Sequence, residues 1–229
     1  MLYFAYGSNC NPAVLERKGV RFRSRVRATL VGYRLRFNKR ALRERLPEDI
    51  GFANIEEAAD QSVEGILYEL EPEDLGRLDE SERYPDHYDR TEVTVEAETG
   101  PVGCFVYQAR PDKTAEGLRP SRNYLNHILE ARDFLSRSYF DALERSQVYE
   151  GACACCQNFQ EVVFIREGDL IHMLCQPCRE SRKIWGSTRG RAMTVPETAA
   201  VVQLVRERGG FSSIQQLMEE AVAERVIDP

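Results

Sequence analysis

Four cysteines in the C-terminal third of the chain have the spacing of metal ligands. Cys153 and Cys156 form one C-x2-C pair, and Cys175 and Cys178 form a second pair after eighteen intervening residues. Two such pairs at this separation are typical of a tetrahedral zinc site, in which each pair presents two thiolates from a tight turn. Because four thiolates leave no position for water, the spacing predicts a structural zinc ion.

Two further residues leave the ligand set open at this point. Cys155 is an alternative to Cys156, which we favour because it preserves the C-x2-C spacing. His172 lies in the same region, but a histidine in mid-strand is more often a packed or surface residue than a ligand. A cluster of buried cysteines without metal is less favoured, because about thirty residues have few other ways to fold alone. Cys10 and Cys104 are remote from the pairs and are expected to be ordinary free thiols.

Residues 3–9, YFAYGSN, change abruptly from strand-forming to turn-forming side chains. The aromatic residues up to Tyr6 favour a strand. Gly7 supplies positive φ freely, while Ser8 and Asn9 favour turns and can bond their own backbone. The stretch therefore predicts a strand that ends in a tight polar loop.

Glu82 is the acid whose position could serve proton transfer. It ends the stretch EPEDLGRLDESE, which begins like a helix, with a proline and acids in its first turn. Leu75 and Leu78 would anchor one face of this helix, and Glu82 lies four residues beyond Leu78. An acid on the apolar side of a helix loses solvation, which suits it to proton exchange. The spacing alone favours the simpler interpretation, a solvated surface charge.

The framework that must position these groups begins with alternating strands and helices. Strands are predicted over residues 2–6, 22–37 with a break at Gly32, 62–70, and 91–108 with a turn inside it. A short helix is predicted after Pro12, and one long amphipathic helix over residues 121–143. Mixed strands and helices in this order predict an α+β domain over residues 1–145.

The rest of the chain has a different composition. Residues 150–182 contain the paired cysteines and a hairpin pattern whose turn is Gly168 and Asp169, and they predict a zinc ribbon. Residues 193–229 predict a helical segment. Thr194 and Glu197 have the spacing of a capping box that starts one of its helices.

The composition limits the class of protein. The 229 residues carry a formal net charge of −6 and are 42% hydrophobic. No stretch approaches the roughly 18 apolar residues that a membrane helix needs. The N-terminal residues do not resemble a secretory signal, so a cytoplasmic location with reduced cysteines is expected.

Four arginines alternate along one predicted strand face: Arg21, Arg23, Arg25 and Arg27. Nucleic-acid binding is one interpretation of this face and of the zinc ribbon. It is less favoured because few aromatic residues lie between the arginines and the whole chain is acidic. A solvated face, or one that meets the chain's own acidic surface or an acidic partner, is expected instead.

The first 145 residues resemble the γ-glutamylcyclotransferase family. The resemblance is carried by YFAYGSN, by GILYEL at residues 65–70, by LDESE at 78–82 and by PSRNYLNHIL at 120–129, which occur in the family's order and rough spacing. It implies a small mixed β-barrel with flanking helices, followed here by the zinc ribbon and the helical tail. It also implies release of 5-oxoproline from a γ-glutamyl amine or amino acid, with no organic cofactor and no catalytic metal.

Carried over residue by residue, the resemblance implies a catalytic acid, a binding loop and pocket tyrosines. The catalytic acid falls on Glu82. The substrate-binding loop falls on Tyr6, Gly7, Ser8 and Asn9, and the pocket tyrosines on Tyr88, Tyr107 and Tyr124. Cys10 departs from the family's apolar residue after the loop, and we expect this to change packing and not chemistry.

The physics of the reaction fits these residue types. A turn that contains glycine can aim consecutive backbone N–H groups at a carboxylate or a developing oxyanion. The substrate's α-amine must lose a proton before it attacks its own γ-carbonyl, and the departing amine must gain one. A single carboxylate can do both, so Glu82 is expected to act as the proton shuttle.

The sequence thus predicts a cytoplasmic γ-glutamylcyclotransferase-like enzyme whose partner is a small γ-glutamyl substrate or a γ-glutamylated product. The attached amine stays open, with glutathione less favoured. The C-terminal helices are expected to pack on the rest of the chain, to bind a protein partner or to form a homodimer. The alternative function is a non-catalytic module that binds γ-glutamyl groups or recruits a partner through the ribbon and the arginine strand.

Overall fold

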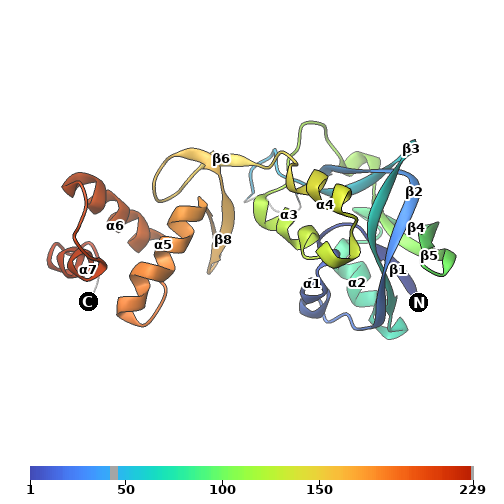
Figure 1. The fold of residues 1–229 in the computed structure, drawn as a ribbon, viewed down its shortest axis with the longest axis horizontal. Helices are drawn as coiled ribbons and strands as arrows, with labels where there is room; N and C mark the ends of the chain where they lie inside the picture. Colours follow the sequence, from blue (N-terminus) through green and yellow to red (C-terminus); the bar gives the residue numbers. More distant parts are fainter. Residues whose placement is uncertain (42–45, 228–229) are drawn as a thin grey trace. The chain divides into compact units, whose positions relative to one another are not determined.

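The computed structural model describes residues 1–41 and 46–227. It divides into two compact units, Met1–Val148 and Tyr149–Pro229 (Figure 1). No helix among the described residues is long and apolar enough to cross a membrane.

A closed barrel forms the centre of the first unit. Its strands are β1 (Leu2–Ala5), β2 (Phe22–Arg40), β3 (Gly51–Leu70), β4 (Tyr88–Ala97) and β5 (Gly100–Ala109). They are hydrogen-bonded in the order β1-β3-β2-β4-β5, and the ring closes where Tyr3 pairs in parallel with Phe105. The other neighbours are antiparallel. The predicted α+β class with a small mixed barrel is confirmed.

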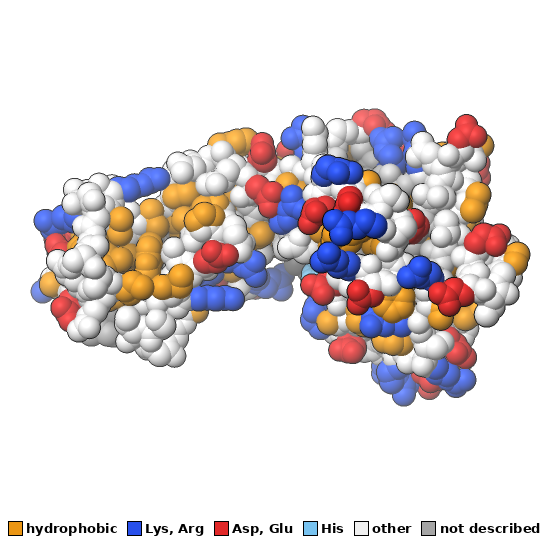
Figure 2. Space-filling view, in the orientation of Figure 1, with side chains coloured by type: hydrophobic (Ala, Val, Ile, Leu, Met, Phe, Trp, Pro, Cys, Tyr) orange, Lys and Arg blue, Asp and Glu red, His pale blue; other side chains and the backbone are white. Residues whose placement is uncertain are grey.

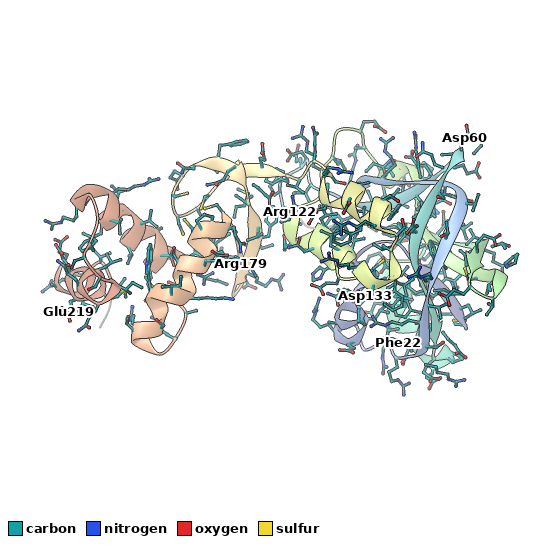
Figure 3. The ribbon with its side chains drawn as sticks, in the orientation of Figure 1. Phe22, Asp60, Arg122, Asp133, Arg179 and Glu219 are labelled. Atoms are coloured by element: carbon teal, nitrogen blue, oxygen red, sulfur yellow. The ribbon has the colours of Figure 1, made fainter. Side chains whose placement is uncertain are left out.

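Apolar and aromatic side chains form the core of this unit. Phe4, Ile55 and Val106 are fully buried members of it. Phe22, labelled in Figure 3, packs edge to face on Tyr68 with 4.9 Å between the ring centroids. These contacts hold the start of β2 against β3.

The β2–β3 hairpin is longer than the sequence predicted. Strand β3 begins at Gly51, not at residue 62, and pairs with β2 as far as Arg40. The predicted break at Gly32 is a register shift between Val31 and Tyr33, inside a continuous strand. Gly32 has φ +83°, and it lies opposite four residues of β3, 58–61, so the extra residues of this bulge belong to β3 while β2 continues without ending.

Helices flank the barrel. The α-helices are α1 (Pro12–Arg17), α2 (Leu75–Glu82), α3 (Arg122–Leu129) and α4 (Arg137–Glu144), and the short 3-10 turns are η1 (Ser8–Cys10), η2 (Pro72–Asp74), η3 (Pro111–Lys113) and η4 (Arg132–Phe134). The prediction of one helix over residues 121–143 is wrong, because η4 separates α3 from α4. Ser136 starts α4 by accepting a hydrogen bond from the Tyr139 backbone N–H.

The arginine face of residues 21–27, at the start of β2, meets the chain's own acids. Arg23 Nε lies 2.9 Å from Glu71 Oε1, and Arg21 Nε lies 2.8 Å from Asp74 Oδ2. Arg27 donates to the backbone oxygen of Asp133, which Figure 3 labels, at 3.2 Å. On the face shown in Figure 2, acidic and basic side chains are interspersed over this unit. These intramolecular pairs agree with the expectation that the arginines face the protein's own acidic surface.

The second unit contains two small hairpins and a set of helices. Strand β6 (Glu150–Ala152) pairs with β7 (Phe159–Glu161), and β8 (Val163–Glu167) pairs with β9 (Leu170–Leu174). The helices are α5 (Gln176–Gly186), α6 (Val195–Arg208) and α7 (Ile214–Ala223), with the 3-10 turn η5 (Ser187–Arg189). The predicted turn at Gly168 and the predicted capping box of Thr194 and Glu197 are both present.

Two separate apolar clusters hold the second unit together. One surrounds the cysteine pairs and includes Leu174 and Val195. The other joins α6 to α7 through residues such as Val201, Leu217 and Ala221. The described part of the predicted 193–229 helical segment ends at residue 227, so its last two residues lie outside the described residues.

Candidate active site and metal centre

The YGSN loop is a compact turn between β1 and α1. Strand β1 ends at Ala5, and the Cys10 backbone N–H donates to the Gly7 carbonyl at 2.9 Å to form η1. Asn11 then starts α1 by accepting from the Ala13 backbone N–H at 2.9 Å. Cys10 is 1% exposed, and its burial raises the pKa of the thiol to about 12. Cys10 is therefore a protonated packing residue.

The backbone conformation of Gly7 is not the left-handed one that glycine readily adopts. Its φ is −108°, so the loop does not use the positive φ that glycine supplies freely. The need for glycine comes from space instead. A Cβ placed on Gly7 would lie 3.1 Å from Tyr124 Oη and 3.2 Å from Ala53 Cβ. The loop backbone is therefore packed closely against side chains of β3 and α3.

The substitution Gly7→Ala should therefore impair the site more than the fold. The added methyl group must push the loop or Tyr124 by a few tenths of an ångström, which shifts Asn9 relative to Glu82. We expect kcat/KM for 5-oxoproline release to fall about 10- to 100-fold, with a small change in melting temperature. Gly103→Ala on β5 is the matched control, because nothing lies within 4 Å of a Cβ at that position. Equal losses in the two variants would contradict the close-approach explanation.

Glu82 lies at the C-terminal end of α2, where Arg83 adopts a left-handed conformation and ends the helix. Leu78, one turn earlier, is fully buried and fixes this face of α2 on the barrel. The Glu82 side chain is 16% exposed. The carboxylate is therefore largely shielded from water.

Two groups bind the Glu82 carboxylate, and one comes from the loop. Asn9 Nδ2 donates to Glu82 Oε1 at 3.0 Å and also contacts Tyr3 Oη at 2.8 Å. Lys18 Nζ donates to the same carboxylate oxygen at 2.7 Å and to Asn9 Oδ1 at 2.8 Å. The structure thus brings together Asn9 and Glu82, which are 73 positions apart in sequence.

The candidate pocket tyrosines line the same region. Tyr88 donates its hydroxyl to the Ala53 carbonyl at 3.1 Å, and Tyr124 Oη accepts from the Ala53 backbone N–H at 3.1 Å. The backbone of Ser8 lies close enough to the Tyr124 hydroxyl to oppose the rise of its pKa. Tyr6 donates to the Tyr107 carbonyl at 2.5 Å. One buried region therefore contains all these rings and the loop.

Burial keeps these hydroxyls neutral. Desolvation raises the pKa of Tyr6, Tyr88 and Tyr124 above the ordinary value, and the negative charge of Glu82 adds to the increase. Tyr107 donates to Asp79 Oδ1 at 2.6 Å, which also disfavours its ionisation. The tyrosines are thus suited to shape and hydrogen-bond the site, and not to act as bases.

Sequence reasoning missed two cations in this region. Lys18 ends α1 and reaches Glu82 across 64 positions of sequence, and no local pattern signals that contact. Lys39 on β2 is 2% exposed, with its ammonium 5.5 Å from the centre of the Tyr88 ring.

A separate cavity of about 560 Å³, lined by Arg36, Tyr139 and neighbouring residues, contains none of the predicted site residues.

The second unit gathers four of its cysteines. The Sγ atoms of Cys153, Cys156, Cys175 and Cys178 all lie within 4.8 Å of one another, and the four residues are buried. Cys153 follows β6, and Cys175 is the N-cap residue of α5. Donor groups of this kind and spacing suit a metal ion.

The other cysteine and histidine residues considered above are not among these four metal-ligand candidates. Cys155 Sγ contacts the Val195 carbonyl at 3.7 Å. His172 Nε2 lies 3.9 Å from Glu167 Oε2. In the first unit Cys104 is buried on β5. None of these three residues belongs to the cluster of four that the described residues form.

The fold and the site define a class of protein: a small α+β barrel in which a tight loop after the first strand meets a shielded acid. The chain belongs to the gamma-glutamyl cyclotransferase, AIG2-like family, whose model matches residues 3–126. No curated protein matches the chain.

Solved structures resemble about two thirds of this chain. A gamma-glutamyl cyclotransferase is 24% identical with a TM-score of 0.56, over 65% of this chain and 88% of its own. An uncharacterized human protein is 25% identical with a TM-score of 0.54, over 65% and 88%. YkqA from Bacillus subtilis is 27% identical with a TM-score of 0.55, over 63% and 53%.

Proposed function

We propose that the protein releases 5-oxoproline from a γ-glutamyl amine or amino acid, with Glu82 as the proton shuttle. The observation that carries the proposal is the position of the Lys18 ammonium, held 2.7 Å from Glu82 Oε1 and 2.8 Å from Asn9 Oδ1. These two acceptors form a site for an alkylammonium group. The α-ammonium of a γ-glutamyl substrate has the same chemistry and takes the place of the lysine when it binds.

The proton balance requires only one carboxylate. The α-nitrogen bonds to the γ-carbon as the bond from that carbon to the departing amine breaks. Two protons leave the α-nitrogen and two reach the departing nitrogen, which leaves as an ammonium ion. Glu82 carries them in turn and ends in its starting state. Holding the amine close to its own γ-carbonyl supplies the proximity advantage.

The loop and the tyrosines surround the reacting group. The backbone N–H of Ser8, which opposes the rise of the Tyr124 pKa in the free protein, becomes a donor to the γ-carbonyl oxygen as negative charge develops on it. Tyr6, Tyr88 and Tyr107 shape the pocket and keep water away. The family membership supports this reaction class.

We also propose that the four-cysteine cluster of the second unit would hold a structural zinc ion. A tetrahedral Zn–S₄ centre has Zn–S distances of about 2.3 Å, so its sulfur atoms lie roughly 3.8 Å apart. Cys156 and Cys175 already have their Sγ atoms 3.7 Å apart. The residues present therefore fit zinc, which would fill its coordination with protein ligands and stabilise the turns that carry them.

The experiment that tests the proposed reaction is a panel assay. Purified protein is incubated with γ-glutamyl amino acids and γ-glutamyl amines, and 5-oxoproline and the free amine are measured together. We expect equimolar release of both from at least one member of the panel. Specific binding of γ-glutamyl compounds without any release would favour the non-catalytic alternative. A homodimer through the C-terminal helices stays a prediction, which the molar mass in solution checks.

A further inference from the structure

Lys39 is a buried cation whose position the proposed chemistry does not yet use. Lys39 lies on strand β2 and is 2% exposed. The ammonium donates to the backbone carbonyl of Arg40 at 2.8 Å and lies over the ring of Tyr88. Lys39 forms no ion pair with any residue that the structure describes. An ammonium has three donors, so this one is incompletely satisfied.

Lys39 belongs to the candidate site through a short series of contacts. The ring that it faces belongs to Tyr88, whose hydroxyl donates to Ala53. Ala53 in turn bonds Tyr124 and lies against the position of a Cβ on Gly7. One ring and one backbone segment thus separate the ammonium from the YGSN loop.

The surroundings of Lys39 leave it positively charged near neutral pH. Burial lowers the pKa of Lys39 to about 8, the charge of Glu82 opposes this decrease, and Lys113 adds to it. Nearby, His87 Nδ1 is buried without a hydrogen-bond partner among the described residues. Burial and the charge of Lys39 both lower the pKa of His87. The region thus has positive charge and unused hydrogen-bonding capacity.

A buried ammonium with no counter-ion among the residues that the structure describes is costly, and an apolar residue would fill the same volume at lower cost. Its presence suggests that an anion binds there. A γ-glutamyl group carries one permanent anion, the carboxylate on its α-carbon. We propose that Lys39 binds this α-carboxylate, an inference that rests on the proposed function.

This assignment gives each polar group of the γ-glutamyl moiety its own partner. Glu82 and Asn9 bind the α-amine, Lys39 binds the α-carboxylate, and the YGSN loop donates to the γ-carbonyl oxygen. The loop then serves the oxyanion and not the carboxylate. The protein therefore selects substrates with a free α-carboxylate, whatever amine is attached to the γ-carbon.

The test compares two substrates in two variants. One substrate is a γ-glutamyl amide that wild type cyclises, and the other is the 4-aminobutanoyl amide of the same amine, which lacks the α-carboxylate and would cyclise to 2-pyrrolidinone. We expect wild type to prefer the γ-glutamyl compound by at least about tenfold in kcat/KM. Lys39→Met should raise KM for it about 10- to 100-fold and abolish the preference.

Two controls separate substrate binding from structure. Lys39→Met should keep or raise the melting temperature, because it removes a buried charge. Lys113→Met removes a nearby lysine that is paired with Asp112 at 2.8 Å and is 33% exposed, and it should keep the preference. Calorimetry should also show that wild type binds 5-oxoproline better than 2-pyrrolidinone, and that Lys39→Met does not distinguish them.

The outcomes separate this inference from the proposed function. If wild type cyclises γ-glutamyl amides but Lys39→Met keeps the full preference for the α-carboxylate, the inference is wrong and the function stands. If wild type cyclises neither compound and binds neither lactam, the proposed function fails and the inference fails with it.

Discussion

Replacing Glu82 with glutamine should reduce kcat for 5-oxoproline release by about 10²- to 10⁴-fold, the usual contribution of a general acid–base group. The amide keeps the shape of the carboxylate and can still accept hydrogen bonds from Asn9 and Lys18. It can neither take a proton from the α-ammonium nor return one to the departing amine. Because the change acts on the chemical step, we expect kcat to fall far more than KM changes.

The matched control for this prediction is Glu80→Gln. Glu80 is an exposed acid on the same helix, so its replacement removes the same charge without touching the site. Rates are measured by simultaneous detection of 5-oxoproline and free amine at saturating substrate. Full activity in Glu82→Gln would show that another group moves the proton, and equal losses in both variants would indicate a general charge effect.

Removing one cysteine of the four-cysteine cluster should abolish metal binding and unfold the second unit. We expect the purified protein to hold about one zinc ion per chain and Cys153→Ser to hold almost none. Structural zinc contributes roughly 10–16 kcal/mol of binding free energy in small zinc-binding peptides, so its loss exceeds what two small apolar clusters can offset. Metal analysis of the two purified proteins measures the occupancy.

The same prediction has a spectroscopic readout and an internal control. Trp185, the chain's single tryptophan, lies on α5 of the second unit and packs against the cluster around Met193. Its emission should shift to longer wavelength in Cys153→Ser or after chelation. Cys155→Ser should keep both the zinc and the emission of wild type. Loss of zinc in Cys155→Ser together with retention in Cys156→Ser would contradict the ligand set.

Local sequence patterns were sufficient to predict the short elements but not their continuity. Strand β3 was predicted only from residue 62, because residues 53–61, ANIEEAADQ, lack the apolar alternation that marks a half-buried strand. The structure extends it by pairing with β2, and that pairing is a tertiary effect. The hydrogen bonds of the long hairpin thus outweigh the low intrinsic β-strand propensity of these residues.

The missed break between α3 and α4 has a different cause. Ile128, Ala131 and Leu135 keep a spacing that continues the helical stripe, and all three are buried. The spacing of hydrophobic residues indicates which face of a segment is buried. It does not show whether the backbone stays helical along the whole segment. The stronger signal was Ser136, whose side chain starts α4, and a serine inside an amphipathic pattern is also compatible with an unbroken helix.

The site could be predicted where a motif identified it and not where it depends on distant contacts. The YGSN loop and Glu82 were named from their motifs, and the structure places Asn9 against Glu82. Lys18 and Lys39 have no motif, and each acquires its environment from segments that are remote in sequence. The neighbours that a Cβ at position 7 would crowd could be identified only from coordinates, because they come from β3 and α3.

The measurement that tests the central claim most directly is turnover of a γ-glutamyl amide in water enriched in ¹⁸O, with mass analysis of the acidic product. Intramolecular attack by the α-amine predicts 5-oxoproline that contains no ¹⁸O, released in equal amount to the free amine. Glutamate that carries one ¹⁸O in its γ-carboxylate would show attack by water. That result would contradict the assignment of Glu82 as the shuttle for a cyclisation.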